Sequence, residues 1–372
     1  MRILHVVKSY QSIGGIERYV KDLVTQHRAR GHKVDILTVS RGRRLQVINQ
    51  EGGNIYLLPH FITYQSARIS LHLPKWLLGL SRQYDIIHFH YPDPGSELSY
   101  LVTRFFMNVP VIVTFHNEIV PTKRFYKLYK PITKHFLGAM DRIIVTSPNL
   151  LRTSAILQGL QDKTVIIPLG IPIPETRSPS ALPSRFPKGA FPRVLFVGRL
   201  SRYKGLPYLI EAMRTAPGHL LIVGEGPLRP TLEAQVHKWK LEERVVFTGH
   251  VSEQILWSLY HDADILVLPS IDRGEGFGYV ILEAMAASTA IISTELGTGT
   301  SYANQHGETG FVVPKQDADA ISEAIRQLAE KPDLLQRFKE NAFKRVRKYF
   351  TLDRMAHRIE QEYISLLWRE KK

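Results

Sequence analysis

Short apolar runs recur along the whole chain and alternate with stretches of helical spacing. The runs are nearly continuous in Val, Ile, Leu and Phe, which is typical of parallel strands buried on both faces. The helical stretches between them complete βαβ units. The runs are RILHVV, KVDILTV, YDIIHFH, PVIVTFH, RIIVTS and TVIIPLG in the first half, and RVLFVGR, HLLIVGEG, RVVFTGH, ADILVLPS, AIISTE and GFVVP in the second. We therefore predict an α/β protein with two doubly wound, Rossmann-like sheets.

A break in composition divides the two halves. The chain has 372 residues, a length that suits two domains of ordinary size. Residues 173–192 are rich in proline and serine, as in an irregular linker. We expect domains at residues 1–172 and 193–351. The last stretch, 352–372, has helical spacing and no strand after it, so by pattern alone it could pack on either domain.

Composition and charge restrict the chemistry. Cysteine is absent, which excludes disulfides, cysteine metal sites and a cysteine nucleophile. No apolar run is long enough for a transmembrane helix, and MRILHVVKSY reads as a strand rather than a secretory signal, so we expect a cytoplasmic protein. The net charge is +15, and residues 1–170 hold 22 Lys and Arg against 10 Asp and Glu. Such a basic half suits phosphate, nucleic acid or an anionic membrane surface, although solvated surface charge is the plainer explanation.

Two carboxylates, eight positions apart, mark the segment RGEGFGYVILEAMAAS at residues 273–288. Glu275 precedes a glycine-bearing loop, and Glu283 lies two turns further on, in a predicted helix. A strand, such a loop and a helix N-terminus form an anion site, because the loop amides and the helix dipole face the same point. The carboxylates lie on nearly one face, so one can meet a sugar ring and the other a ribose. The segment predicts a nucleotide-sugar site.

Two cations follow the first strand of the second half. Arg199 and Lys204 lie at the strand end where such sheets bind ligands, flanked by glycines. Arginine can form bidentate hydrogen bonds to a phosphate, and lysine adds a point charge. We therefore favour phosphate binding by these residues over an ordinary role as solvated surface charges. Glu225, after the next strand, can accept hydrogen bonds from ribose hydroxyls or a base edge, and equally can serve as a turn or capping residue.

The first half carries weaker signals. Gly14 and Gly15 fall between the first strand and the first helix, where a backbone without Cβ atoms can approach a ligand, or where the chain simply turns. His116 ends a strand before a polar loop and is well placed to touch a substrate. His88 and His90 end another strand, but the spacing specifies no third metal ligand, and a satisfied core histidine is the commoner outcome.

Basic and aromatic side chains alternate between residues 121 and 136. The basic members are Lys123, Arg124, Lys127, Lys130 and Lys134. The apolar members that can insert or stack are Phe125, Tyr126, Leu128, Tyr129 and Ile132. Such a segment can lie on an anionic membrane, bind single-stranded nucleic acid through stacking, or be an ordinary solvated helix face.

Taken in order, these elements resemble the retaining glycosyltransferases of family 4, which have the GT-B fold. The likeness covers nearly the whole chain and is densest between residues 193 and 314. Each motif alone is weak, whereas the set in this order and spacing is highly specific. The motifs are Gly14-Gly15, His116, Gly198-Arg199, Lys204-Gly205, Gly224-Glu225-Gly226, the Glu275/Glu283 pair and the run HGETGFVVP.

The resemblance implies a role for each matching residue. Arg199 and Lys204 would hold the donor diphosphate. Glu283 would bind the ribose and Glu275 the hydroxyls of the transferred sugar, while His116 would lie by its reacting face. The expected catalytic set is thus Arg199, Lys204, Glu275 and His116. The further donor-binding positions are Gly14, Gly15, Gly198, Gly224, Glu225, Gly276, Phe277 and Gly278. The family needs no cofactor and no metal ion, and it returns its last helix to the N-terminal domain.

One segment departs from the common family pattern. Many members have Gly-Gly and then Glu after the AIIST strand, whereas this chain has TELGTGTSYANQHGETG, which leaves the donor-sugar contacts of residues 296–300 open. The variant resembles a branch that makes bacterial surface polysaccharides and includes mannosyltransferases. GDP-mannose is therefore the expected donor, with a UDP-sugar as the alternative.

The expected acceptor is a lipid-linked saccharide or an oligosaccharide. The protein would be peripheral on the inner face of the cytoplasmic membrane, on anionic lipid. Two other classes fit less well. A non-catalytic nucleotide-sugar binder would keep these carboxylates and cations only by chance. A nucleic-acid-binding protein leaves Glu275 and Glu283 unexplained, and we expect no nucleic-acid partner.

Overall fold

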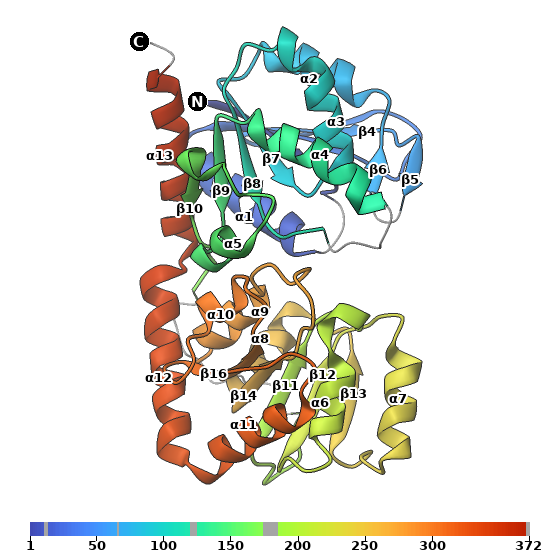
Figure 1. Cartoon of the computed structure of the whole chain (residues 1–372), viewed down its shortest axis with the longest axis vertical. Coiled ribbons are helices and arrows are strands. Elements are labelled where there is room, and N and C mark those ends of the chain that lie inside the picture. Colours follow the sequence, from blue (N-terminus) through green and yellow to red (C-terminus); the bar gives the residue numbers. More distant parts are fainter. Residues whose placement is uncertain (11–13, 65–66, 120–124, 174–184, 370–372) are drawn as a thin grey trace. The chain divides into compact units, whose positions relative to one another are not determined.

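The computed structural model describes residues 1–10, 14–64, 67–119, 125–173 and 185–369. The chain folds into two compact units (Figure 1). Unit 1 comprises Met1–Gly170 together with Leu352–Lys372, and unit 2 comprises Ile171–Thr351. Much of the predicted linker, residues 174–184, lies outside the described residues. Among those that are described, no helix combines the length and the apolarity needed to cross a bilayer.

Unit 1 is built on an eight-stranded sheet in the order β10-β9-β8-β7-β1-β2-β4-β3. Its neighbouring strands are parallel, apart from β3, which is antiparallel to β4. The strands are β1 (Arg2–Val7), β2 (Lys33–Val39), β3 (Gln46–Gln50), β4 (Gly53–Leu58), β7 (Ile86–Tyr91), β8 (Val111–Phe115), β9 (Arg142–Val145) and β10 (Thr164–Ile166). A separate antiparallel hairpin consists of β5 (Ile62–Tyr64) and β6 (Ala67–Ile69).

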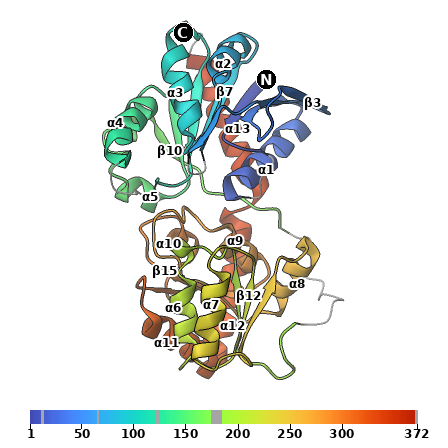
Figure 2. The same ribbon diagram turned by 90° about the vertical axis from the view of Figure 1, so that its right-hand side faces the viewer.

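Helices cover both faces of this sheet. Figure 2 shows α3 and α4 on one side of it and α1 and α13 on the other. The helices are α1 (Gly15–Ala29), α2 (Leu73–Ser81), α3 (Pro94–Thr103), α4 (Phe125–Gly138), α5 (Pro148–Thr153) and α13 (Leu352–Arg369), with 3-10 turns η1 (Arg104–Phe106) and η2 (Gln161–Lys163). Strands β7 and β8 are therefore buried along their whole length, and their polar side chains, His88, His90 and Thr114, are buried with them.

The sequence analysis missed strands β3 to β6. Strand β3, QVINQ, is exposed at every position and forms an edge of the sheet. An edge strand needs no continuous apolar run, because only one of its sides pairs with the sheet and its side chains meet solvent. The rule used to find buried parallel strands therefore could not detect it.

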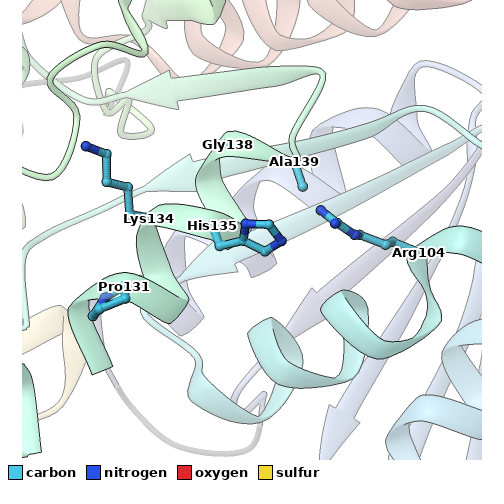
Figure 3. Close-up of a pocket in the computed structure, with 6 residues that line it drawn as sticks. All are labelled: Arg104, Pro131, Lys134, His135, Gly138 and Ala139. Atoms are coloured by element: carbon cyan, nitrogen blue, oxygen red, sulfur yellow. The ribbon is translucent and has the colours of Figure 1, made fainter. Parts of the chain in front are cut away.

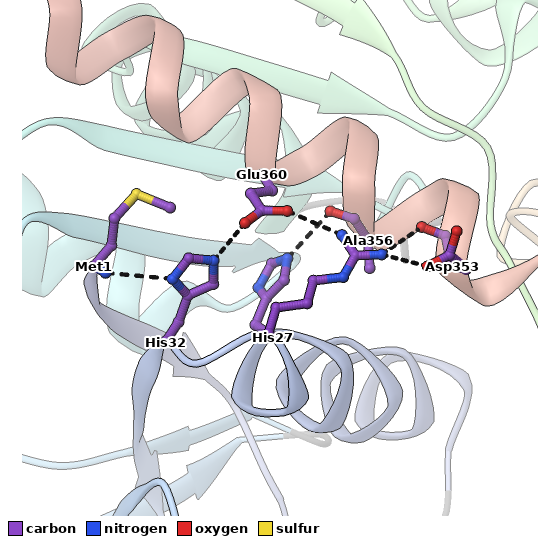
Figure 4. Close-up of polar contacts among 7 residues, drawn as sticks. Met1, His27, His32, Asp353, Ala356 and Glu360 are labelled. Atoms are coloured by element: carbon purple, nitrogen blue, oxygen red, sulfur yellow. Dashed lines mark hydrogen bonds and ion pairs between the residues drawn. The ribbon is translucent and has the colours of Figure 1, made fainter.

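The C-terminal helix α13 packs on α1 within unit 1, and polar contacts fix its position (Figure 4). Arg30 donates to Asp353 at 2.6 Å and to Glu360 at 3.0 Å. The Nε2 atom of His32 lies 2.5 Å from the second oxygen of Glu360. Deeper in the interface, Nε2 of His27 lies 3.2 Å from a backbone carbonyl of α13. Burial lowers the pKa of His27 to about 4, so this ring is neutral at physiological pH.

Unit 2 is built on a six-stranded, fully parallel sheet in the order β13-β12-β11-β14-β15-β16. Its strands are β11 (Arg193–Val197), β12 (His219–Val223), β13 (Val245–Gly249), β14 (Ile265–Leu268), β15 (Ala290–Thr294) and β16 (Gly310–Val313). Its helices are η3 (Arg202–Lys204), α6 (Leu206–Ala212), α7 (Arg229–Lys238), α8 (Glu253–Asp262), α9 (Tyr279–Ala286), α10 (Thr300–Ala303), α11 (Ala318–Glu330) and α12 (Pro332–Tyr349).

The parallel strands of each sheet reverse their order at one point. The reversal falls between β1 and β7 in unit 1, and between β11 and β14 in unit 2. In open parallel sheets, ligands bind beyond the carboxyl ends of the strands at such a switch point. Every predicted apolar run contains a strand, and the predicted doubly wound α/β class is confirmed for both units.

Candidate active site

The switch point of unit 2 holds a buried ion pair. Lys204 follows β11, and Glu275 follows β14, the strand next to it. The Nζ atom of Lys204 donates to Oε2 of Glu275 at 2.5 Å, and the hydroxyl of Ser270 donates to the same oxygen at 3.0 Å. Lys204 is 7% exposed and Glu275 is 8% exposed. Two opposite charges are thus held together, almost out of solvent, where the fold favours a ligand.

The charge on Lys204 is secured by its partner. Burial alone disfavours the ammonium form, but the neighbouring Glu275 carboxylate outweighs this effect and raises the pKa of Lys204 above its ordinary value. Lys204 is therefore cationic at physiological pH. A buried cation of this kind offers strong attraction to a phosphate that reaches it, because water screens it little.

Glycines in the loops make this arrangement sterically feasible. Gly205 has a φ of +68°, and a Cβ on it would overlap the carbonyl oxygen of Pro269. Gly224 has a φ of +129°, and a Cβ there would overlap the carbonyl oxygen of Gly198. Only glycine relieves both the backbone strain and the overlap. The loops after β11, β12 and β14 therefore approach one another closely, which brings Lys204 to Glu275.

Glu283 lies in the second turn of α9 and is also buried. The hydroxyl of Tyr260, on α8, donates to Oε2 of Glu283 at 2.6 Å. Because α9 begins at Tyr279, the loop between Glu275 and Glu283 ends at a helix N-terminus, where backbone amides attract anions. The structure thus places both predicted carboxylates in the loop and helix that follow β14.

The other predicted residues of unit 2 are arranged less directly. Arg199 is exposed at the carboxyl end of β11. Glu225 forms an ion pair with Arg229 one helical turn away, which the sequence analysis did not foresee. Its backbone carbonyl accepts from Leu200 at 2.9 Å and so joins the loops after β11 and β12. Glu225 therefore has at least a structural role in the turn.

Phe277 is predicted to meet the donor through the backbone amides of its loop, and its side chain has a separate, structural role. Its ring is buried and packs against the rings of Tyr302 and Phe350, with centroids 6.4 and 5.8 Å apart. Its neighbour Gly276 accepts a hydrogen bond from Gly299 at 2.7 Å. The side chain of Phe277 thus anchors the loop to the core, and only the backbone of the loop is left to meet a ligand.

Sequence reasoning missed Ser270 and Tyr260. Both donate directly to the predicted carboxylates. Ser270 closes the run ADILVLPS, so its position at a strand end was a usable signal. Tyr260 lies in α8, in a separate part of the sequence, and no local pattern ties it to Glu283.

In unit 1, the predicted His116 is part of a chain of buried histidines. The Nε2 atom of His116 lies 3.2 Å from Nδ1 of His90, and Nε2 of His90 lies 2.9 Å from Nδ1 of His5. Burial lowers the pKa of His116 to about 3, so the ring is neutral at physiological pH. The sequence analysis did not single out His5, because a histidine inside RILHVV reads only as a strand residue.

A further histidine, His88, lies beside this chain. Its Nε2 lies 2.7 Å from the hydroxyl of Thr114, and its Nδ1 lies 2.6 Å from the hydroxyl of Tyr363 on α13. The nitrogens of His5, His88 and His90 come within 4.8 Å of one another, which is close enough to consider a metal ion. However, the rings of His88 and His90 stack, with centroids 4.5 Å apart and 21° between planes. Stacked rings direct their lone pairs along parallel planes, whereas metal ligands converge on one point.

The predicted glycine loop of unit 1 is occupied by a neighbouring side chain. Gly14 precedes α1, and Gly15 is its first residue. A Cβ on Gly14 would overlap the carboxylate of Glu17, which lies in the first turn of α1. An anion that approached this helix N-terminus would therefore meet a carboxylate already there.

The predicted basic and aromatic segment is only partly described. Lys123 and Arg124 lie outside the described residues, and Lys127 lies in α4. Lys130 is partly buried, and Lys134 is exposed. Tyr129 needs a correction, because it is buried rather than free to insert or stack.

A hollow of about 500 Å³ lies beside the described part of α4 (Figure 3). The residues around it include two cations, Arg104 and Lys134, and the others are Pro131, His135, Gly138 and Ala139. Part of the predicted basic surface is thus present, but it extends to η1, which the sequence analysis did not consider.

Comparison with known proteins gives concordant results for both halves of the chain. Residues 13–174 match the family model described as Glycosyltransferase Family 4, and residues 183–345 match that of Glycosyl transferases group 1. The chain is 33% identical over 370 residues to O-antigen chain mannosyltransferase C of Escherichia coli, with 99% of each chain covered. It is 34% identical to D-rhamnosyltransferase WbpZ of Pseudomonas aeruginosa, with 94% of this chain and 92% of the relative covered.

Solved structures agree on the fold. Sucrose-phosphate synthase from Thermosynechococcus elongatus superposes with a TM-score of 0.80 at 26% identity, with 99% of each chain covered. Anabaena Alr3699/HepE in complex with UDP gives a TM-score of 0.82 at 20% identity, with 98% of this chain and 100% of that chain covered. At the latter identity, the likeness concerns the fold alone.

Proposed function

Because this chain belongs to the family 4 glycosyltransferases, with their GT-B fold, we propose that it transfers mannose from GDP-mannose to a bacterial surface glycan. The reaction proceeds with retention of configuration and without a metal ion. The observation that carries the proposal is the buried Lys204–Glu275 pair at the switch point of unit 2. Relatives over nearly the full chain that act on mannose or D-rhamnose support the choice of sugar.

The positive groups of unit 2 stabilise the leaving group. As the bond between sugar and diphosphate breaks, negative charge builds on the phosphate. Lys204, Arg199 and the N-terminus of α9 supply fixed positive potential for that charge, which replaces a metal ion. One such preorganised contact is typically worth about 3 kcal/mol in the transition state.

Donor binding rearranges the ion pair. The diphosphate competes with Glu275 for the ammonium group of Lys204, and Glu275 turns to the hydroxyls of the sugar. Glu283, held by Tyr260, accepts hydrogen bonds from the ribose. The acceptor hydroxyl then attacks from the face that the phosphate leaves, and the departing phosphate takes its proton. A double displacement would need a carboxylate free to attack the anomeric carbon, whereas Glu275 is engaged with the hydroxyls of the sugar once the donor is bound.

The acceptor is a lipid-linked saccharide, and the protein binds anionic membrane as a peripheral protein. An exposed apolar patch supports this part of the proposal. Val102, Phe105 and Phe106 are 68%, 77% and 70% exposed at the end of α3 and in η1. Arg104, which lines the basic hollow with Lys134 (Figure 3), immediately precedes Phe105 in the chain. Apolar side chains that enter lipid beside cations that meet its headgroups are the usual composition of an interfacial site.

Thermal unfolding with a panel of nucleoside diphosphates tests the donor. GDP at 100 times its dissociation constant should stabilise the protein by about 2.7 kcal/mol, and UDP at the same concentration should have little effect. Release of GDP from GDP-mannose, with and without an oligosaccharide acceptor, then tests transfer. Selective stabilisation by UDP would replace GDP-mannose with a UDP-sugar. Binding without any release of nucleoside diphosphate would make the protein a non-catalytic binder.

A further inference from the structure

We propose that His90 and His5 are positioning residues that hold His116 in a single tautomer, in which Nε2 accepts and Nδ1 carries the proton. The inference rests on the proposed function, and on the place by the reacting face of the transferred sugar that the family resemblance implies for His116. Neither His5 nor His90 needs to touch the substrate. They act through the hydrogen bonds that link the three rings.

The geometry of the chain couples the three rings. His5 and His90 are joined at 2.9 Å, and His90 and His116 at 3.2 Å. Successive rings stack, with centroids 5.2 and 5.5 Å apart and angles of 20° and 22° between their planes. A neutral imidazole has one donor and one acceptor nitrogen. If the rings are neutral, the direction of one hydrogen bond therefore fixes the direction of the other.

All three rings are neutral at physiological pH. Burial is the main cause that lowers the pKa of His5 and His90 well below the ordinary value, and burial lowers the pKa of His116 to about 3. Neighbouring groups add to this effect at two of the rings. His27 and Arg28 from α1 act on His5, and His88, His5 and His116 act on His90. No ring can therefore serve as donor on both nitrogens.

The buried ring at the end of the row of histidines, His5, determines the direction of the hydrogen bonds that link the three rings. Within the described part of the chain, Nε2 of His5 is buried and has no hydrogen-bond partner. If His116 donated to His90 and His90 donated to His5, Nε2 of His5 would be an unpaired N–H group. If His5 donates to His90 and His90 donates to His116, Nε2 of His5 is an unpaired acceptor. Unpaired buried N–H groups are the rarer and more costly of the two. His5 therefore donates from Nδ1 to His90, and His90 donates from Nδ1 to His116.

Neighbouring side chains prevent the rings from turning. Tyr19 meets His116 edge-on, with centroids 4.6 Å apart, and meets His90 in the same way at 5.7 Å. His88 also stacks on His90 and is itself held at both nitrogens by Thr114 and Tyr363. With the ring planes fixed, only the positions of the protons remain to be set. His116 then presents Nδ1–H as a neutral donor to an oxygen of the bound saccharide.

Nuclear magnetic resonance of the intact protein tests the tautomer directly. With ¹⁵N-labelled histidine, two-bond couplings distinguish a ring protonated at Nδ1 from one protonated at Nε2. We expect His116 to be protonated at Nδ1 and to stay so from pH 6 to 8. A His116 ring protonated at Nε2, or an equal mixture, would overturn the inference. This measurement needs no donor or acceptor, so its failure is distinct from failure of the proposed transfer reaction.

Paired variants of His90 test the positioning role. In His90→Asn, the side-chain amide can still donate from near the position of Nδ1, whereas His90→Leu has no donor. We expect His90→Leu to lower kcat about tenfold, with little change in the donor KM, and His90→Asn to restore most of this loss. His27→Leu is the matched control, because His27 is a buried histidine of the same unit whose hydrogen bond goes to Ala356 and not to these three rings. This variant should leave kcat unchanged.

A double substitution separates positioning from general damage to the fold. In a His116→Ala background, His90→Leu should cause no further loss of kcat, because the ring that it positions is gone. An equal loss in both backgrounds would show that His90 acts otherwise, as would a His90→Asn variant no more active than His90→Leu. If His90→Leu does not fold, the tautomer of His116 in the wild-type protein and in His5→Asn still decides the matter. We expect Nδ1 to be protonated in both.

Discussion

The Nζ atom of Lys204 lies 2.5 Å from Oε2 of Glu275, although 71 residues separate the two along the chain. Lys204 follows strand β11 and Glu275 follows its neighbour β14, so the contact is a product of the strand order. Each charge is nearly buried, and each compensates for the cost of burying the other. The pair is therefore a structural element of unit 2 and, by our proposal, also binds the donor.

Removal of Lys204 should strongly reduce turnover. We expect Lys204→Ala to lower kcat at least about a hundredfold, because the leaving phosphate loses its buried cation. The free energy of unfolding should also fall by about 3 kcal/mol, since an unpaired carboxylate remains buried. Glu275→Ala should likewise lower turnover at least about a hundredfold while the fold survives. Near-normal transfer by purified Lys204→Ala would remove the assigned phosphate role.

The double variant Lys204→Met/Glu275→Gln separates stability from catalysis. It leaves no buried charge, so urea unfolding should show most of the lost stability regained. Its turnover should stay as low as that of Lys204→Ala. A double variant that recovers activity together with stability would mean that the pair has only a structural role.

The hydrogen bond between Tyr260 and Glu283 should affect donor binding more than chemistry. Tyr260→Phe removes a donor to a buried carboxylate, which typically costs about 1.5–3 kcal/mol. We expect the donor KM to rise about tenfold, with kcat nearly constant, because Glu283 loses its fixed position. Tyr208→Phe is the matched control, since its hydroxyl meets Gln316 at an exposed site. A rise in KM of equal size in both variants would contradict the prediction.

Glu97 should give unit 1 a distinctive pH dependence. Burial raises the pKa of this carboxyl to about 7, although hydrogen bonds, including those from Thr133 and from the backbone of Asp93, favour its charged form. The folded state therefore binds more protons than the unfolded state between about pH 4.5 and pH 7. The contribution of Glu97 to stability falls as the pH rises through this window, by about 3 kcal/mol at most.

The variant Glu97→Gln tests the direction of this change of stability with pH. It stays neutral at every pH and can still accept from Thr133, so it should gain stability relative to the wild type as the pH rises from 5 to 8. The difference between the two unfolding curves isolates Glu97 from other groups. The lowered pKa of His27 has the opposite effect, with stability lost as the pH falls from about 6.5 to 4. Parallel curves for variant and wild type would contradict the assignment.

The exposed aromatic pair at η1 should control membrane binding. Phe105→Ser/Phe106→Ser should abolish co-flotation with vesicles that contain anionic phosphatidylglycerol, because the apolar insertion is lost. Val246→Ser, which removes an exposed apolar side chain of unit 2, should float like the wild type. Binding of the wild type should weaken with salt and with removal of anionic lipid. Flotation that is insensitive to salt, or absent altogether, would remove the membrane proposal.

Local sequence patterns were sufficient for the doubly wound class and for much of the site in unit 2. A parallel strand covered on both faces is mostly apolar, so β7, β11 and β14 could be recognised without any knowledge of their neighbours. The loops at their carboxyl ends could then be located, and with them the positions of Lys204 and Glu275. Strand β3 escaped because its side chains are exposed and carry no such pattern.

Contacts between distant residues were beyond the reach of those patterns. Which strand lies beside which depends on how helices and sheets pack, and no run of residues encodes that order by itself. The tertiary structure alone therefore decided that Lys204 meets Glu275, that Tyr260 holds Glu283, and that His5 joins His90 across 85 residues. It likewise decided that α13 lies on α1, some 330 residues earlier in the chain. The sequence by itself determined the elements and the chemistry at their ends, while packing determined which of those ends share a site.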